Sequence, residues 1–159
     1  MSRPLLAVDV DGVIVLLGEE DPGGHTAMRL ELIDGMMHRV SLEAGDRLRR
    51  LAERYELVWA SGWEERANEH FPRLLDIPKL PHIGFHGKAR FGSAHWKLGP
   101  LEAFSQGRPV AWIDDNFDDA CHAWAKERIA PTLLVPVEPH RGLEEAHVEA
   151  LVAWAQTLD

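Results

Sequence analysis

Two acids one residue apart, Asp9 and Asp11, are the first side chains of the chain that could do chemistry together. They follow an apolar stretch, residues 4–8, which is typical of a buried strand. In extended backbone, residues i and i+2 point to the same side, so both carboxylates can face one pocket. The same Asp-x-Asp-Gly segment also suits an ordinary turn, since Asp and Gly are common turn residues.

A second acidic group follows the apolar stretch 110–113. Asp114 and Asp115 are adjacent, and two neighbouring carboxylates are unfavourable unless a cation or a proton neutralises them. A ligand set made only of oxygen atoms suits a hard cation such as Mg²⁺. The alternative is a capped helix start, which explains Asp118 and Asp119 more easily than the pair before them.

A hydroxyl and an amine occupy comparable places along the chain. Ser61, followed by Gly62, comes directly after the apolar stretch 56–60. Lys97 opens a helical segment in which Pro100 fits the first turn, where its missing N–H is not needed. Taken alone, Lys97 is interpreted as an ordinary surface lysine.

The elements that must position these side chains alternate along the chain. Predicted strands cover residues 4–8, 56–60, 81–85, 110–113 and 132–137. Amphipathic helices are expected over 44–55, after Asn116 as N-cap, and over 143–154. This alternation predicts a three-layer, Rossmann-like α/β domain with a mainly parallel five-stranded sheet. Ligands of such sheets bind beyond the carboxyl ends of the strands, which is where the polar residues above would meet.

Two segments depart from the alternation. Residues 27–42 contain two short extended runs joined by Asp34-Gly35, a strong signal for a two-residue hairpin, and we expect a small β-hairpin flap there. Residues 84–97 form a loop rich in Gly, His and basic side chains. Neither insertion is large enough for a folded cap, and no linker composition divides the chain. We therefore expect one domain over residues 1–159 with no large cap.

The overall composition narrows the classes of partner. The chain has 159 residues, 26 acids and 17 Lys or Arg, a balance that disfavours a long contact with a nucleic-acid backbone. A cation held by the two acidic clusters would offset part of that charge. No apolar run approaches the roughly 18 residues of a membrane span, and the N-terminal residues do not have the pattern of a signal peptide. With Cys121 as the one cysteine, we expect a reducing, cytoplasmic location.

The order Asp-x-Asp, Ser, Lys, Asp-Asp along the chain resembles the four motifs of the haloacid dehalogenase (HAD) superfamily. The resemblance covers Leu5 to Asp119 and points to a phosphatase-type, capless or minimally capped member. True dehalogenases resemble the family but lack the second acid, so Asp11 favours phosphate chemistry. Response-regulator receiver domains use similar groups in a different order along the chain, and this sequence does not follow that order.

The resemblance implies a role for each matching residue. Asp9 would be the nucleophile that forms an aspartyl-phosphate, and Asp11 the general acid/base whose backbone carbonyl also binds Mg²⁺. Ser61 and Lys97 would hold the phosphoryl group, with Gly12 and Gly62 as neighbouring substrate-binding residues. The metal site would draw on Asp9, Asp11 and the fourth motif, in which Asp115 matches the direct ligand, Asp119 the supporting acid and Asp114 the variable first position.

The expected substrate is a nucleotide or another small phosphorylated metabolite. Alternatives are a phosphatase of nucleic-acid ends or phosphoproteins, and a metal- or phosphate-binding regulatory module with weak catalysis. Without a cap the site would be open, so a homo-oligomer or a partner could cover it.

Several polar and aromatic residues near the expected edge have two interpretations each. The histidines His82, His86 and His95 suit zinc ligands or ordinary loop residues. Contacts to the substrate or plain surface and packing roles remain open for Trp63, Trp96, His38, Arg39, Lys88, Arg90, His140 and Arg141.

Overall fold

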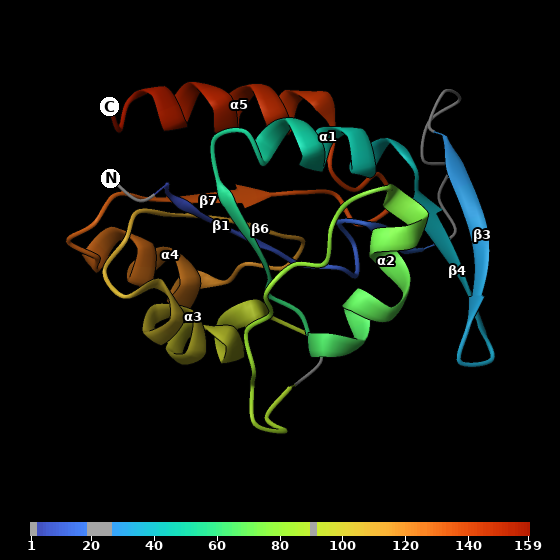
Figure 1. Cartoon of the computed structure of the whole chain (residues 1–159). Coiled ribbons are helices and arrows are strands. Elements are labelled where there is room, and N and C mark those ends of the chain that lie inside the picture. The colour runs from blue at the N-terminus through green and yellow to red at the C-terminus, as the bar shows by residue number, and fades with distance from the viewer. Residues whose placement is uncertain (1–2, 19–26, 90–91) are drawn as a thin grey trace.

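The computed structural model describes residues 3–18, 27–89 and 92–159, and a parallel sheet runs through its centre (Figure 1). The strands are β1 (Leu5–Val8), β5 (Glu56–Trp59), β6 (Val110–Asp114) and β7 (Thr132–Pro136). Their order is β5-β1-β6-β7, and every pairing is parallel. An α/β domain with a parallel sheet is confirmed.

Helices cover both faces of this sheet. Figure 1 shows α1 (Glu43–Leu51) and α5 (Glu145–Gln156) on one side, with α3 (Leu98–Ser105) and α4 (Asp119–Glu127) on the other. Alternate residues of β1 explain the two layers: Leu6 and Val8 pack into the core under α1 and α5, whereas Leu5 and Ala7 pack with residues of α3 and α4. The fifth helix, α2 (Ala67–Leu75), packs against α1.

A second, antiparallel sheet contains the expected hairpin. Its strands are β2 (Val15–Leu16), β3 (Met28–Ile33) and β4 (Met36–Ser41), in the order β2-β4-β3. Asp34 (φ 51°) and Gly35 (φ 80°) join β3 to β4, and positive φ at both positions is the pattern of a type I′ turn. β2 follows the Asp-x-Asp segment and pairs with β4, so the hairpin stands beside the end of β1.

The five-stranded sheet is not found among the described residues. Residues 81–85 were expected as a strand, but they make a single parallel bridge, between His82 and Trp59. The Trp59 N–H donates to the Pro81 carbonyl, and the Ile83 N–H donates to the Trp59 carbonyl. Pro81 has no N–H to extend this ladder, and the central sheet of the described residues has four strands.

The start of α4 also differs from expectation. Asp118, not Asn116, is the N-cap, because its Oδ1 accepts the Cys121 N–H at 3.1 Å. The Asn116 N–H instead donates to Asp114 Oδ1 at 3.1 Å. The acid nearer the helix thus takes the capping role that acids favour, and Asn116 stays at the sheet edge.

Two short 3₁₀ helices lead into the helices beside the sheet edge. Glu64–Arg66 precedes α2, and Ala94–Lys97 precedes α3. Both lie within residues 62–97. The described residues of this segment contain no separately folded unit. None of the helices in the described part of the chain is both long and apolar enough to cross a bilayer.

Candidate functional site

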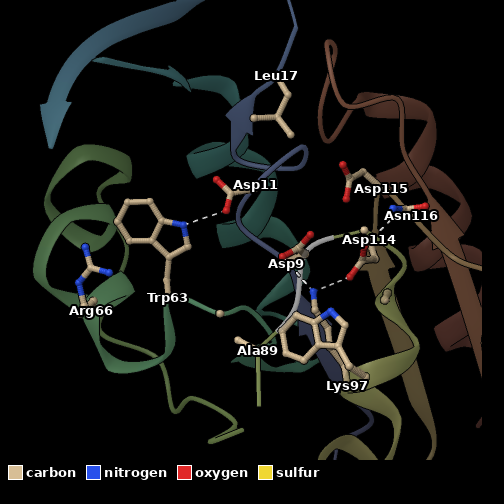
Figure 2. A pocket seen from close by; sticks show the side chains of 14 residues that line it. Asp9, Asp11, Leu17, Trp63, Arg66, Ala89, Lys97, Asp114, Asp115 and Asn116 are labelled. Atoms are coloured by element: carbon tan, nitrogen blue, oxygen red, sulfur yellow. Dashed lines mark hydrogen bonds and ion pairs between the residues drawn. The ribbon is translucent and has the colours of Figure 1, made fainter. Parts of the chain in front are cut away.

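The ends of β1 and β6 bring the two acidic groups together. These strands are paired at Val8 and Ile113, and the Asp9 N–H donates to the Ile113 carbonyl at 3.1 Å. The next residue of each strand, Asp9 and Asp114, therefore meets the other at the carboxyl edge. Carboxylate oxygens of Asp9, Asp114 and Asp115 all lie within 4.8 Å of one another (Figure 2). Three of the acids singled out in the sequence thus lie together at one edge of the sheet, and their role as a metal site stays a prediction.

Lys97 lies within the acidic cluster. Its ammonium is 3.1 Å from Asp9 Oδ1 and 2.6 Å from Asp114 Oδ2, and only 3% of the residue is exposed. Lys97 is the last residue of the 3₁₀ helix Ala94–Lys97, which places its ammonium beside the acids at the sheet edge. Lys97 is thus a buried partner of both acidic groups, and the surface-lysine interpretation is wrong.

The charges of this cluster do not balance. Asp9 and Asp114 are 6% and 2% exposed, and Asp115 is half-buried, while Lys97 is the one cation in ion-pair contact with them among the described residues. Burial raises the pKa of Asp9 well above its ordinary value; Lys97 opposes this shift, and Asp114 and Asp115 add to it. An excess of buried negative charge is the condition under which a cation binds favourably.

The other members of the cluster respond to the same field. Burial, together with the Asp114 charge, raises the pKa of Asp115 to about 6. Burial acts to lower the pKa of Lys97, but the neighbouring carboxylates of Asp9 and Asp114 outweigh it, so the pKa is raised. Lys97 therefore stays charged at neutral pH.

Asp11 lines the same cavity as Asp9 but lies outside the three-acid cluster. The side chain is exposed, and its Oδ2 accepts the indole N–H of Trp63 at 3.1 Å (Figure 2). The Trp63 ring is held edge-on by Phe71, with ring centroids 5.1 Å apart. A fixed indole thus orients the carboxylate that the resemblance assigns to proton transfer.

Ser61 and the two glycines have supporting positions. Ser61 is buried, and its Oγ accepts the Trp63 N–H at 3.1 Å, while Gly62 lines the cavity. Gly12 has φ of 82°, and a Cβ there would lie 2.3 Å from Asp115 Oδ2. Only glycine lets the backbone after Asp11 approach the acidic cluster this closely.

Asp119 lies apart from the other predicted metal ligands. It is exposed in the first turn of α4 and does not belong to the group of acids that could share one ion. Its neighbour Asp118 caps the helix and lies 2.8 Å from Nδ1 of His95. The supporting role that the resemblance implies for Asp119 thus stays a prediction.

The site opens into a cavity of about 460 Å³. The cavity is lined by the acids and Lys97, by two indoles and several small residues, and by Arg66 and Asn116 (Figure 2). The lining residues are Asp9, Asp11, Leu17, Gly62, Trp63, Arg66, Ala89, Gly92, Ala94, Trp96, Lys97, Asp114, Asp115 and Asn116. Trp63 and Trp96, for which the sequence allowed either stacking on the substrate or packing, both line this cavity. Trp63 also packs on Phe71, and Trp96 packs on Phe85.

Arg66 and Asn116 are lining residues that the sequence analysis did not assign to the site. Arg66 lies over the Trp63 ring, 5.2 Å from its centroid, and forms an ion pair with Asp34 of the hairpin turn. A basic residue shortly after Ser61 was the available signal. Asn116 was interpreted as a helix cap because acids and amides commonly cap helices.

None of residues 27–42 lines the cavity. The hairpin instead contacts side chains that do line it. His38 packs edge-on against Trp63, with centroids 5.6 Å apart. Arg39 lies on the other face of β4 and donates to the Gly18 carbonyl at 2.8 Å. His38 and Asp34, which pairs with Arg66, are thus the hairpin residues that contact the cavity wall.

The predicted zinc alternative is not supported in the described part of the chain. His82 pairs with Glu65 at 3.0 Å, His95 pairs with Asp118, and the exposed His86 lies in a turn with φ of 53°. Lys88, His140 and Arg141 do not line the cavity, and Arg141 pairs with Glu144 at 3.2 Å. Arg90 lies outside the described residues.

The donor set suits Mg²⁺. Asp9, Asp114 and Asp115 supply only oxygen atoms, which are the ligands this hard cation prefers, and Gly12 leaves room beside Asp115. Three carboxylates would leave other coordination positions of the ion to water and phosphate, as Mg²⁺ usually requires.

No protein-family model matches this chain, and a search of curated proteins finds no relative. Its likeness to the HAD superfamily therefore rests on the motifs described above. The geometry places Asp9, Lys97, Asp114 and Asp115 in contact at one sheet edge, with Asp11 on the wall of the same cavity.

Proposed function

We propose that this protein is a Mg²⁺-dependent phosphohydrolase of the HAD superfamily that cleaves phosphomonoesters through an aspartyl-phosphate on Asp9. The observation that carries the proposal is the buried cluster of Asp9, Asp114 and Asp115 around the ammonium of Lys97. Such a cluster has a carboxylate nucleophile, a fixed cation and a place for a second cation within one cavity. Phosphoryl transfer requires this combination, because charge develops on the phosphoryl oxygens.

The metal would be held by Asp9, Asp115 and the backbone carbonyl of Asp11, with Asp114 next to them. Bound there, Mg²⁺ supplies positive charge to the phosphoryl oxygens. Asp114 accepts from Lys97 at 2.6 Å and so fixes the ammonium at the edge of this site. Asp119 is not part of the proposed ligand set, because it is exposed on α4.

In the first half-reaction, a carboxylate oxygen of Asp9 attacks phosphorus and the ester P–O bond breaks. The contacts to Asp9 from Lys97 and from the Val10 N–H both use Oδ1, so Oδ2 is the proposed attacking oxygen. Asp11 gives its proton to the leaving oxygen, and the alcohol departs. Lys97 remains charged and stabilises the transferring phosphoryl group.

In the second half-reaction, water attacks the phosphorus of the aspartyl-phosphate. Asp11, now a carboxylate, takes the proton of this water, the bond from Asp9 to phosphorus breaks, and inorganic phosphate is released. The same residue thus acts first as acid and then as base. The Trp63 indole N–H holds Asp11 Oδ2 and supports its orientation in both steps.

The size and lining of the cavity favour a small phosphorylated metabolite as the substrate, with a nucleotide as the first choice. Its volume of about 460 Å³ is within the range of small-molecule sites. Indole faces of Trp63 and Trp96 offer surfaces for an aromatic or sugar leaving group, and Arg66 offers a cation at the rim.

A phosphatase screen tests the proposal. Nucleotides, sugar phosphates, phosphopeptides and end-phosphorylated oligonucleotides would be assayed with Mg²⁺ and with EDTA, using Asp9→Asn prepared in the same way as the background control. We expect Mg²⁺-dependent release of phosphate from a small metabolite and none above background from Asp9→Asn. Equal turnover by wild type and Asp9→Asn, or no turnover on any class of substrate, would overturn it.

A further inference from the structure

Strand β3 is an edge strand with an apolar outer face. It pairs with β4 on one side, and among the described residues it has no partner on the other (Figure 1). Its sequence, Met-Arg-Leu-Glu-Leu-Ile, contains neither proline nor lysine, the residues with which proteins commonly protect such edges. An unprotected edge is a template for another strand.

The outer face of the hairpin is unusually apolar for an exposed surface. Leu30 and Leu32 are 60% and 64% exposed, Met37 on β4 is 60% exposed, and Met28 is 39% exposed. These four side chains share one face, because Met28, Leu30 and Leu32 alternate along β3 and Met37 is opposite Leu32. Arg39, opposite Leu30, lies on the same face and donates to the Gly18 carbonyl. The inner face carries Arg29, Glu31 and the buried Ile33 instead, and within the chain Glu31 pairs with Arg29 at 3.2 Å and with Arg73 at 3.5 Å.

The hydrogen-bonding groups of β3 are divided in the same way. The Leu42 N–H donates to the Ala27 carbonyl, so the odd-numbered residues of this strand direct their backbone groups toward β4. The N–H and C=O groups of Met28, Leu30 and Leu32 therefore point to the free edge. A second strand can bond to these three residues without disturbing the ladder between β3 and β4.

The charges of β3 select a partner and a register. A two-fold axis between two copies makes their β3 strands antiparallel. With the axis at Leu30, Met28 pairs with Leu32 of the second copy, and Arg29 is opposite the second copy's Glu31. An axis at position 29 or 31 would place Arg opposite Arg or Glu opposite Glu, which is destabilising.

We propose that the chain forms a two-fold symmetric dimer in which β3 pairs with β3 of a second copy, centred on Leu30. The result is one continuous six-stranded antiparallel sheet, with opposite charges paired on its inner face and Met and Leu side chains in contact on its outer face. In antiparallel sheets the pair that is not hydrogen-bonded has the closer side chains, and here that pair is Arg29 with Glu31. The proposal is independent of the proposed reaction.

The dimer would also bear on the cavity of each copy. The hairpin contacts the cavity wall through His38, which packs on Trp63, and through Asp34, which pairs with Arg66. Pairing at β3 would hold the hairpin, and with it these two contacts, in one position. The partner copy adds no residue to the cavity in this arrangement.

The test is the mass of the full chain in solution across a concentration series, by sedimentation equilibrium. Wild type should approach twice 17.9 kDa with rising concentration. Arg29→Glu and Glu31→Arg should each remain monomeric alone, because each makes the paired charges alike. Mixed in equal amounts they should form a heterodimer, because the two acids of one variant then lie opposite the two arginines of the other.

A backbone variant and a surface control complete the test. Leu30→Pro removes an N–H that points away from β4, so it should abolish the dimer and leave the circular dichroism spectrum unchanged. Ile129→Lys changes an exposed apolar residue remote from β3 and should leave the dimer intact. A monomeric wild type at every concentration would overturn the proposal, and so would a dimer that survives Leu30→Pro or two charge variants that do not associate when mixed.

Discussion

Single residues of this site are defined by what surrounds them. Asp9 and Asp11 are two positions apart, yet one is buried against Lys97 and the other is exposed and bonded to Trp63. A buried carboxylate beside an ammonium suits a nucleophile that must face phosphorus. An exposed carboxylate held by one donor suits an acid that must exchange protons with the leaving group and with water.

The first prediction separates these roles. Asp9→Asn should remove turnover, because an amide oxygen does not form the aspartyl-phosphate. Asp11→Asn should lower kcat by about 10²–10⁴-fold, the range typical of general acid–base catalysis. Steady-state kinetics on the best substrate of the screen would measure both. Asp11→Asn activity near that of wild type would contradict the assignment.

The second prediction concerns the indole that orients Asp11. Trp63→Phe keeps an aromatic ring against Phe71 but removes the N–H donor. A hydrogen bond to a charged group contributes about 1.5–3 kcal/mol, so we expect kcat to fall roughly tenfold to a hundredfold with a smaller change in KM. In an Asp11→Asn background, which lacks the proposed acid, the same Trp63→Phe change should have no further effect on kcat. Equal fold losses of kcat in both backgrounds would mean that the bond to Asp11 has no part in turnover.

At the scale of elements, the hairpin and the last helix show how local structure supports the site. The hairpin turn follows from Asp34-Gly35 alone, but its contacts to Trp63 and Arg66 depend on where the small sheet lies relative to the 3₁₀ helix Glu64–Arg66. Helix α5 covers the core beneath β1 and begins at a local cap. There the Glu144 N–H donates to Nδ1 of His147 at 2.9 Å.

The third prediction uses this cap. Burial lowers the pKa of His147 below its ordinary value near 6.5, and the bond from Glu144 needs the unprotonated ring. The unfolded chain therefore binds this proton more readily. The stabilisation by neutral His147 is present above pH 6.5 and is lost as the pH falls through the ordinary pKa toward the lowered one.

Thermal melting from about pH 5 to about pH 8 would measure this effect. His147→Gln keeps an acceptor at the third helical position and should melt like wild type at about pH 8, with less loss at acid pH. His147→Ala removes the acceptor and should lose about 1 kcal/mol at that pH, a shift of about 2–4 °C. A pH dependence identical to that of wild type in both variants would exclude His147 as its source.

For the whole molecule, the acidic cluster would couple the proposed binding of Mg²⁺ to stability. Asp9, Asp114 and Asp115 repel one another, and Lys97 neutralises part of their charge. In the metal-free protein the raised pKa of Asp115 means that the folded state holds its proton more tightly. Its contribution to stability therefore falls as the pH rises from the ordinary value of 3.8 to about 6.

The fourth prediction follows from this coupling. Mg²⁺ at about 100 times its dissociation constant should stabilise the fold by about 2.7 kcal/mol at neutral pH. The effect should weaken as the pH falls through about 6, because a proton on Asp115 competes with the ion. Melting with Mg²⁺ and with EDTA would measure it for wild type, Asp115→Asn and Asp119→Asn.

The two variants separate the acids of the fourth motif. Asp115→Asn should lose most of the response to Mg²⁺, whereas Asp119→Asn should keep it, since Asp119 is exposed on α4. A full response in Asp115→Asn would remove Asp115 from the proposed ligand set. A lost response in Asp119→Asn would place that acid in the metal site after all.

Features that depend on neighbouring residues along the chain could be predicted from the sequence. Apolar stretches before Asp9 and Asp114 predicted strands, and strands of a parallel sheet end at a common edge, so both acids were expected at that edge. That they are neighbours there depends on the pairing of β1 with β6. Asp34-Gly35 predicted the hairpin, because both residues tolerate positive φ. Lys97 was predicted for the site only by the order of the motifs.

Tertiary structure alone decided the features that depend on packing between distant segments. Examples are the hydrogen bond from Trp63 to Asp11 and the ion pair of Arg66 with Asp34. The exposed position of Asp119 is a third. No pattern in the sequence predicts any of these three features. The segment 81–85 has strand-like composition, but it forms a single bridge, between His82 and Trp59, and Pro81 lacks the N–H that would extend the ladder. Local propensity selects the type of an element, whereas long-range contacts select its partners, and partners decide which side chains share a site.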